Sequence, residues 1–436
     1  MKTFFKKIVT QVLIWEAKTA LKKYKPRIVG ITGSVGKSSS KEAVSAVLER
    51  RYYTRKSIKS YNSELGLALA ILDLETAWHS PLGWIKNIFG GFKEIFNKKF
   101  PEILILEMGV DRPKDLDKLL AIARPEISIV TAIGDIPVHV EFFAGPEEIA
   151  KEKAKILKTL SATGYALLNF DDAIVWSMRE ATKAHVISFG FGEGAEIRAL
   201  NEKISNDGVS FKISYQGSLV PCKMRNVLGK QYIYAALAAA AAGVTFDINL
   251  IEVSEALSIY KPLPGRMNLI SGTKQSLILD DSYNSSPLAA RAALETLKEL
   301  EAGRKIVALG DMLELGKYTI EAHRAIGKKI AKVADYFIAV GPRSKFAADE
   351  AIVQGMNPKN VINFSTSSEA APYIKNLIKE GDIVLVKGSQ SMRMEYIVEE
   401  IMNDPESAKE LLARQDKYWR PRRDLNPGYM DENHAS

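Results

Sequence analysis

The residues best suited to chemistry lie in one short segment rich in glycine and serine. Residues 30–39 read GITGSVGKSS, after an apolar stretch typical of a strand and before a pattern typical of a helix. Glycines in such a turn let backbone N–H groups close around phosphate oxygens, and the start of a helix adds positive potential. Lys37 can reach the β- and γ-phosphates of a nucleotide, and the hydroxyl of Ser38 can bind Mg²⁺. The segment therefore predicts a phosphate-binding loop.

The spacing of this loop is a variant of the strict pattern. Ile31 stands where the strict pattern has glycine, which leaves TGxxGKS at residues 32–38. The plainer alternative is a glycine- and serine-rich turn at a helix start. That alternative does not explain why Lys37 and Ser38 follow the expected strand and loop at the spacing that a phosphate-binding loop requires.

Strand-like and helix-like stretches alternate from residue 27 to about residue 400, which is the pattern of parallel sheets covered by helices. The expected strands are Arg27–Ile31, Ile103–Glu107, Ile127–Ala132 and Tyr165–Asn169, followed later by Leu277–Asp281, Lys305–Leu309, Tyr336–Val340 and Ile383–Lys387. The expected helices include Lys37–Glu49 and Pro146–Leu160. Residues 195–224 alternate between polar and apolar with turn signals, so we expect a small antiparallel excursion there.

These elements predict an α/β protein with a parallel-sheet central ATPase domain of the P-loop type, followed by a Rossmann-like α/β C-terminal domain. We place a basic N-terminal helix at 1–27 and the central domain at 28–262, with an insertion at 76–100. The C-terminal domain is placed at 263–402, after the PLPG turn at 262–265. A polar tail at 403–436 is expected to fray.

Composition excludes several classes of protein. The chain has 436 residues, 46% of them hydrophobic and 26% charged, as in a globular protein of more than one domain. Its one cysteine rules out a disulfide framework or a multi-cysteine zinc site and fits a reducing cytoplasm. No apolar run is long enough to cross a bilayer.

Two segments carry charge and aromatic side chains without an assigned role. Residues 1–27 hold eight Lys or Arg and one acid, Glu16, which accounts for nearly all of the net charge of +8. The apolar residues of this segment are Phe4, Phe5, Ile8, Val12 and Trp15. They could rest on an anionic membrane or dock the helix on the protein body. The stretch 78–100 could be a lid over the substrate, a face for a membrane or partner, or a packed helical insertion.

Acidic residues follow two of the expected strands. Glu107 ends an apolar strand at the same sheet edge as the phosphate loop, where open α/β sheets bind ligands. A carboxylate there is costly unless it is paired or bound to a cation. Asp280 and Asp281 also end a strand, and they are either turn formers or site residues. His139, taken alone, is more often structural than a ligand.

Taken together, the motifs of this chain resemble those of the Mur ligase family. The motifs run in order: TGxxGKS at 32–38, LEMG at 106–109, VHVEFF at 138–143, IAKEK at 149–153, LNFDD at 168–172, GRM at 265–267, DDSYN at 280–284, GDMLELG at 310–316 with His323, and KGSQSMRME at 387–395. The last two resemble one branch, the ligases that add D-alanyl-D-alanine to a muramyl peptide.

The resemblance implies a cytoplasmic, ATP- and Mg²⁺-dependent ligase that activates a carboxylate as an acyl phosphate and joins it to an amine. The implied catalytic residues are Lys37, His139 and Lys153, the last as a carbamylated lysine. The implied ATP-binding residues are Thr32, Gly33, Ser34, Val35, Gly36, Lys37, Ser38, Ser39, Arg266, Asp281 and Asn284. The implied metal ligands are Ser38, Glu107, His139 and Lys153. Asn62 and Glu64 would face the substrate.

The chain also departs from the family pattern. Only 26 residues precede the first strand, where the family has a uridine-binding domain, so we expect weak discrimination between UDP-linked and UDP-free muramyl peptides. GKQY at 229–232 replaces the usual GxHN, and Ala235 and Ala132 stand where asparagine is common. SSP at 285–287 replaces ANP.

The sequence leaves two rival functions open. One is a related ligase with another acceptor, such as a folylpolyglutamate-type enzyme, against which the two branch motifs argue. The other is a non-catalytic nucleotide-binding partner, against which the retained site residues argue. The expected partners are a muramyl-peptide-like substrate and a D-Ala-D-Ala-like amine, with no nucleic acid. Peripheral membrane contact through 1–27 or 78–100 stays an open possibility. A GTPase is disfavoured because no NKxD signature is present.

Overall fold

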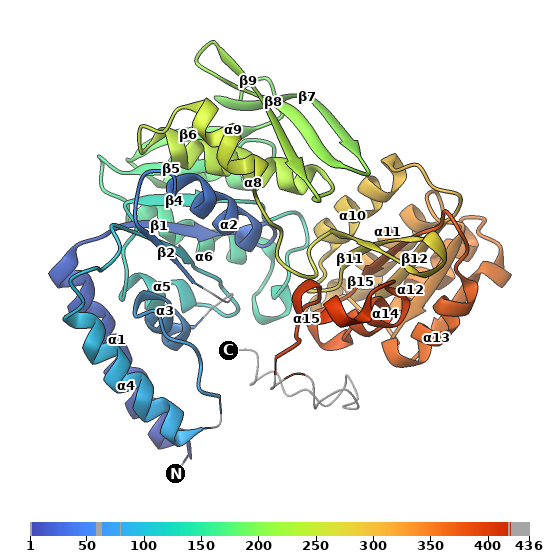
Figure 1. The fold of residues 1–436 in the computed structure, drawn as a ribbon, viewed down its shortest axis with the longest axis horizontal. Coiled ribbons are helices and arrows are strands. Elements are labelled where there is room, and N and C mark those ends of the chain that lie inside the picture. The colour runs from blue at the N-terminus through green and yellow to red at the C-terminus, as the bar shows by residue number, and fades with distance from the viewer. Residues whose placement is uncertain (1, 58–62, 79, 417–418, 420–436) are drawn as a thin grey trace.

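The computed structural model describes residues 2–57, 63–78, 80–416 and 419, with side chains from residue 5 onward. These residues form two sheets, one of nine strands and one of six (Figure 1). We call them the larger and the smaller sheet. The α/β class predicted from the sequence, with two successive parallel sheets, is confirmed.

The larger sheet has the strand order β2-β3-β1-β4-β5-β6-β7-β8-β9. Its strands are β1 (Arg27–Thr32), β2 (Thr54–Lys56), β3 (Ile103–Glu107), β4 (Ile127–Val130), β5 (Tyr165–Asn169), β6 (His185–Gly190), β7 (Ile197–Ser205), β8 (Gly208–Tyr215) and β9 (Ser218–Arg225). The pairs from β2 to β7 are parallel, and β7, β8 and β9 pair in antiparallel fashion. The antiparallel excursion predicted for 195–224 is therefore confirmed as an extension of the same sheet.

Both faces of the larger sheet are covered, because its strands are apolar on both sides. One face buries Val29, Ile31 and Ile105 under helices α2, α8 and α9. The opposite face buries Ile28 and Leu104 in a second core formed with α1, α3, α5, α6 and α7. The helices are α1 (Lys2–Tyr24), α2 (Lys37–Leu48), α3 (Glu64–Ile71), α4 (Pro81–Ile95), α5 (Asp115–Leu120), α6 (Pro146–Lys158), α7 (Ala173–Ser177), α8 (Lys230–Val244) and α9 (Leu250–Ser258).

The smaller sheet has the order β10-β11-β15-β12-β13-β14, and β10 is its antiparallel edge. Its strands are β10 (Asn268–Ser271), β11 (Leu277–Asp281), β12 (Lys305–Gly310), β13 (Tyr336–Val340), β14 (Val361–Phe364) and β15 (Ile383–Lys387). The helices around it are α10 (Pro287–Glu299), α11 (Thr319–Ile330), α12 (Ser344–Val353), α13 (Ser367–Leu377), α14 (Glu395–Ile401) and α15 (Ala408–Leu411). One continuous core joins its α10–α12 face to the larger sheet, and α13 and α14 cover the other face.

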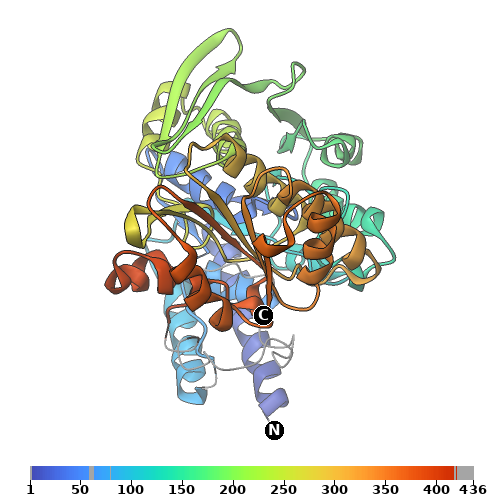
Figure 2. The same ribbon diagram turned by 90° about the vertical axis from the view of Figure 1, so that its right-hand side faces the viewer.

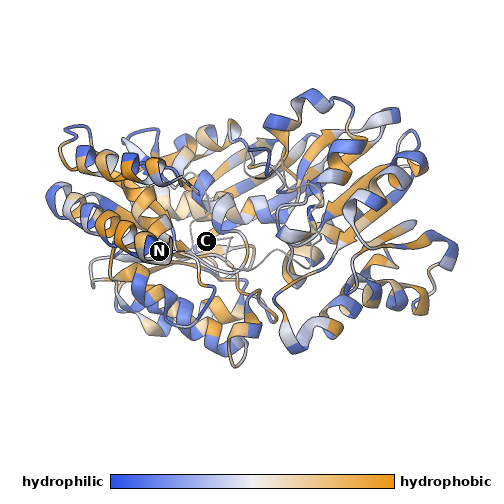
Figure 3. Ribbon diagram, turned by 90° about the horizontal axis from the view of Figure 1, so that it is seen from below, coloured by the Kyte–Doolittle hydropathy of each residue, from blue (hydrophilic) through white to orange (hydrophobic). Residues whose placement is uncertain are grey.

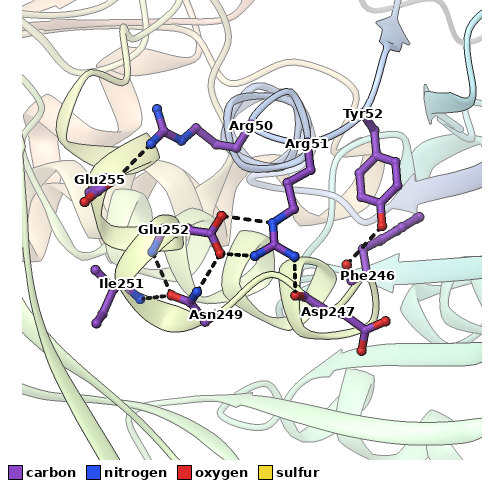
Figure 4. A network of polar contacts seen from close by, with 9 residues as sticks. All are labelled: Arg50, Arg51, Tyr52, Phe246, Asp247, Asn249, Ile251, Glu252 and Glu255. Atoms are coloured by element: carbon purple, nitrogen blue, oxygen red, sulfur yellow. Dashed lines mark hydrogen bonds and ion pairs between the residues drawn. The ribbon is translucent and has the colours of Figure 1, made fainter.

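Short 3₁₀ turns complete the connections. They are Val140–Phe142, Met178–Ala181, Thr273–Gln275, Gly316–Tyr318, Pro358–Asn360, Gln390–Met392 and Pro405–Ser407. A surface network also ties the end of α2 to the start of α9 (Figure 4). There, Arg51 donates to both carboxylate oxygens of Glu252 and to the carbonyl of Asp247.

Helices α1 and α4 extend together from the body of the molecule (Figures 1 and 2). Helix α1 is held by Val9, Leu13, Ile14, Ala17 and Ala20, which are buried. These are not the apolar residues singled out from the sequence, because Phe5, Ile8 and Trp15 are exposed. No helix in the described part of the chain is long and apolar enough to span a membrane.

The expectation that the chain frays from about Asn403 is wrong for residues 403–416. Ala408, Leu412 and Ala413 are buried, and Arg414 is only 9% exposed. The Arg414 guanidinium pairs with Glu395 and donates to the carbonyl of Tyr283. The stretch is polar on average, but a few apolar residues and Arg414 are buried and attach it to the protein.

Glu395 should be a large contributor to the stability of this region. It is fully buried, and it accepts from Arg393 Nε at 2.6 Å and from Arg414 Nη1 at 2.8 Å. Glu395→Ala would leave two buried guanidinium groups without their carboxylate, which typically costs about 3–5 kcal/mol. We expect a clearly lower midpoint in denaturant or thermal unfolding. Glu400→Ala is the control, because its partner Lys375 is exposed and such pairs contribute about 0–1 kcal/mol. Equal shifts in the two variants would contradict this assignment.

Glu16 should make the packing of α1 sensitive to pH. Its side chain is buried against Gly91 of α4, and its Oε2 atom has no hydrogen-bond partner among the described residues. Burial raises its pKa from 4.5 to about 7. The protonated form is therefore favoured in the folded state, so this contribution to stability is complete below pH 4.5 and is lost as pH rises through about 7.

The Glu16→Gln variant should remove this part of the pH dependence. The difference in melting temperature between variant and parent should grow as pH rises through about 7. Glu301→Gln, at an exposed position, serves as the control and should leave the profile unchanged. A Glu16→Gln profile parallel to that of the parent would show that Glu16 does not titrate on unfolding.

Candidate active site

The phosphate loop lies between β1 and α2, where the sequence predicts it. Gly33 has φ 144° and Gly36 has φ 89°, a region that side chains with a Cβ rarely adopt. A Cβ on Gly33 would lie 2.0 Å from Oγ1 of Thr131. The N–H groups of Ser34 and Val35 donate to the carbonyl of Ala132 at 2.7 and 3.1 Å. Ala132 therefore fixes the loop through its backbone.

Two hydroxyl groups of the loop have no hydrogen-bond partner in the described part of the chain. Oγ1 of Thr32 and Oγ of Ser34 are buried, and neither has a hydrogen-bond partner among the described residues. Ser39, in the first turn of α2, is buried too, but its hydroxyl is not one of the two without a partner. Buried hydroxyl groups without partners are rare, and the oxygens of a bound phosphate could satisfy them. This arrangement fits the nucleotide phosphates implied by the motif.

Two lysines meet at one carbonyl oxygen of the loop. Nζ of Lys37 donates to the carbonyl of Gly33 at 3.0 Å, and Nζ of Lys153 donates to the same oxygen at 3.1 Å. Lys153 comes from α6 and is 2% exposed. Burial first, and then the neighbouring charge of Lys37, lower the pKa of Lys153 to about 7. A substantial fraction of this amine is therefore neutral near neutral pH.

Ser38 and Glu107 lie together at the edge of the sheet. Glu107 ends β3, beside Ile31 of β1, and Oγ of Ser38 donates to its Oε2 at 2.9 Å. Hydroxyl and carboxylate oxygens are ligands that Mg²⁺ accepts together with water and phosphate oxygens. The residues present therefore fit a magnesium ion bound largely through a nucleotide. Within the described ranges, no group of three or more His, Cys, Asp or Glu side chains could hold a metal by itself.

His139 has a different environment from the one expected. Its Nδ1 lies 2.8 Å from Oε2 of Glu314, and its Nε2 lies 3.3 Å from Oδ1 of Asp111. The sequence interpretation missed both carboxylates as neighbours of His139. Asp111 follows Glu107 by four residues, and Glu314 lies within the GDMLELG motif, but nothing local pairs either one with the histidine. The role of His139 as a metal ligand stays a prediction.

The GDMLELG motif, residues 310–316, is held rigidly so that Glu314 reaches His139. Oδ1 of Asp311 accepts from the N–H of Ser344 at 2.7 Å. Nε2 of His323 accepts from the N–H of Met312, and the N–H of Leu313 donates to Oγ of Ser389. Both branch motifs thus support one loop at the boundary between the two sheets.

Arg266 links the smaller sheet to the phosphate loop. Its Nη2 donates to Oγ of Ser38 at 3.0 Å, and its guanidinium lies 4.3 Å from the ring centroid of Tyr283. The hydroxyl of Tyr232, from α8, donates to the Arg266 carbonyl. Arg266 therefore lies beside Ser38 of the loop, and its contact with a nucleotide phosphate stays a prediction.

The remaining predicted residues are not brought into the same cluster. Oδ2 of Asp281 pairs with Nζ of Lys387 at 2.6 Å, and Lys387 also donates to the carbonyl of Asn284 at 2.9 Å. The side chain of Asn284 is exposed. Glu64 begins α3 after its cap, Ser63, and is half-buried. Asn62 lies outside the described residues, so the substrate contacts stay predictions.

Two further acidic residues shape the sheet edge without reaching the loop. Oδ2 of Asp172 accepts from the N–H groups of Ile133 and Gly134. Asp171 accepts from the hydroxyl of Tyr234 and from the N–H of Phe191. The LNFDD motif therefore holds the loops that follow β4 and β6.

Comparisons with known proteins agree with this geometry. Residues 31–243 match the Mur ligase middle domain, and residues 265–390 match the Mur ligase glutamate ligase domain. The UDP-N-acetylmuramoyl-tripeptide–D-alanyl-D-alanine ligase of Bacillus subtilis is 28% identical over 393 residues, which are 89% of this chain and 79% of that protein. The Escherichia coli ligase of the same name is 26% identical over 378 residues, covering 85% and 76%.

A solved structure supports the same placement. The MurF ligase from Thermotoga maritima, in complex with ADP, superimposes with a TM-score of 0.75 at 25% identity, over 90% of this chain and 83% of that one. The two matched domains together span most of the chain, and they contain the phosphate loop, Glu107, Lys153 and Arg266. The chain belongs to the Mur ligase family.

Proposed function

We propose that this chain is an ATP-dependent amide ligase that joins D-alanyl-D-alanine to the peptide carboxylate of a muramyl tripeptide. The observation that carries the proposal is the convergence of Lys37, Ser38, Glu107 and Arg266 on one sheet edge. The names of the Bacillus subtilis and Escherichia coli relatives supply the substrate class. The two branch motifs, which position Glu314, favour this class over a folate-type acceptor.

The proposed reaction has two steps. A substrate carboxylate oxygen attacks the γ-phosphorus of ATP, giving an acyl phosphate and ADP. The amine nitrogen of the dipeptide then attacks the acyl carbon, phosphate leaves with the bonding electrons, and the nitrogen loses a proton. Catalysis of this kind depends on positioning and on neutralising negative charge. No covalent intermediate with the enzyme is needed.

The chain's own residues supply that positioning. Lys37 and the loop N–H groups would hold the β- and γ-phosphates. Arg266 would bring a second positive charge from the smaller sheet as the domains close. Ser38 and Glu107 would hold Mg²⁺, which when bound neutralises charge on the phosphate oxygens.

The direct test is product analysis. The full chain would be incubated with ATP, Mg²⁺, D-Ala-D-Ala and a panel of muramyl tripeptides, both UDP-linked and free, and new amides would be detected by mass. The expected product is a muramyl pentapeptide formed together with ADP and phosphate. Amide formation only with glutamate and a folate acceptor would establish the rival ligase. Absence of any ATP turnover with the complete panel would favour the non-catalytic alternative.

Lys37→Ala should abolish turnover without unfolding the chain. Loss of one preorganised group that stabilises charge typically lowers the rate by roughly 100- to 1000-fold. Steady-state release of ADP measures this, and circular dichroism checks the fold. Lys345→Ala, an exposed lysine on α12, should retain the parental rate. A folded Lys37→Ala protein with normal turnover would disprove the assignment of the phosphate loop.

We further propose that Lys153 works as a carbamate. Its neutral amine can attack CO₂ to give a carbamate and a proton, which replaces a cation by an anion with two hard oxygen donors. The burial of Lys153 and its pKa of about 7 support this, because only the neutral amine reacts. Raising pH through about 7 should therefore speed carbamylation.

Lys153→Ala should lose most ligase activity and recover part of it with formate or acetate, which can take the position of the carbamate. Lys151→Ala is the matched control, because Lys151 lies on the same helix with its side chain exposed. The parental enzyme should also lose activity in CO₂-depleted buffer and regain it with bicarbonate. Full activity without CO₂ would show that Lys153 acts as an unmodified amine.

A further inference from the structure

Helix α4 carries an exposed apolar stripe that no described part of the chain covers. Leu82, Ile85, Phe89, Phe92 and Phe96 follow one another at spacings of three and four residues, so they lie along one side of the helix. Their side chains are 43–78% exposed. The other side of α4 packs inward through Gly91 and Ile95. Large apolar side chains gathered in this way mark an interaction surface rather than ordinary scatter.

Helix α1 carries a similar stripe next to the first. Phe5, Ile8, Val12 and Trp15 repeat at the same spacing, and Trp15 is 57% exposed. The side of α1 that contains Leu13 and Ala17 is fully buried. Helix α1 therefore has apolar residues on two sides, of which only one is needed to attach it to the protein.

The two helices pack side by side, so the stripes form one surface. Glu16 of α1 lies against Gly91 of α4, and Nζ of Lys23 donates to the carbonyl of Ile95 at 2.6 Å. The same ammonium lies 5.0 Å from the ring centroid of Phe96, whose ring contacts that of Phe92. The pair projects from the body, and its apolar colouring is visible from below (Figures 2 and 3).

The charges around this surface are almost all positive. Exposed lysines on the two helices and just after α4 are Lys6, Lys7, Lys18, Lys22, Lys23, Lys86, Lys93, Lys98 and Lys99. Of the acids on α1 and α4, Glu16 is buried and Glu94 pairs with Arg55. The acidic segment containing Glu75 contacts α4 through Asn87, on the side of the helix opposite the stripe.

We infer that α1 and α4 form a docking surface for an anionic lipid membrane. Aromatic and aliphatic side chains would enter the interfacial layer, while the surrounding lysines would lie among anionic headgroups. A protein partner fits less well, because lysine is depleted at protein–protein interfaces. This surface goes beyond the proposed catalytic function and does not depend on it, since none of its residues belongs to the active site.

The test is vesicle co-sedimentation of the full chain. Vesicles of pure phosphatidylcholine would be compared with vesicles of about two parts phosphatidylcholine to one part phosphatidylglycerol. We expect binding to the anionic vesicles only, weakened by added salt. The double variant Phe89→Ser/Phe96→Ser should bind at least about tenfold more weakly, as should Lys86→Glu/Lys93→Glu.

Two matched control variants distinguish binding through this surface from nonspecific hydrophobic or electrostatic binding to the vesicles. Ile259→Ser/Val353→Ser removes equally exposed apolar groups elsewhere, and Lys212→Glu/Lys223→Glu removes exposed lysines from the larger sheet. Both controls should bind as the parent does. Failure of the parent to bind anionic vesicles would overturn the inference. So would a dimer, detected by sedimentation velocity without lipid, that the Phe89→Ser/Phe96→Ser variant abolishes.

Discussion

The carbonyl oxygen of Gly33 is the point on which the active site depends. The side-chain nitrogens of Lys37 and Lys153 both donate to this one oxygen. The loop that presents it is pinned to Ala132, and a Cβ at Gly33 would collide with Thr131. When both amines are protonated, two like charges meet at one neutral acceptor, which disfavours the charged form of the buried Lys153. A bound phosphate would supply the missing negative charge, so the loop is arranged for an anion.

The same region is completed from the smaller sheet. Arg266 reaches Ser38, and Glu314 reaches His139, although both residues lie in the C-terminal half of the chain. Close packing fixes this relation, because a Cβ on Gly316 would lie 2.9 Å from Cβ of Glu141. Movement of one sheet against the other would therefore break both the contact of Arg266 with Ser38 and the contact of Glu314 with His139. The site is thus complete only with the two sheets in this arrangement.

Sequence reasoning predicted the strands well because buried parallel strands are short apolar runs with little ambiguity. The bounds of β3, β5, β11, β13 and β15 agree with the predicted ranges. It located Ser38 beside Glu107 because both sit at the carboxyl edge of neighbouring strands. It could not pair His139 with Asp111 and Glu314, since these contacts depend on how distant loops meet. For α1, apolar residues lie on two sides of the helix, so the sequence left open whether Phe5, Ile8 and Trp15 face a membrane or the protein body; in the structure they are exposed.

The state of Lys153 follows from its surroundings rather than from its motif alone. An amine with the ordinary lysine pKa of 10.5 would need about 5 kcal/mol to lose its proton at pH 7. With a pKa of about 7, Lys153 loses its proton at that pH for almost no free energy. A cation near Ser38 and Glu107 would oppose Mg²⁺, because like charges repel one another more strongly where little water screens them. Burial thus lowers the free energy needed to form the neutral amine that the proposed carbamylation requires, and metal binding would favour the anionic product. The burial that makes this lysine a poor ammonium group makes it a suitable site for CO₂.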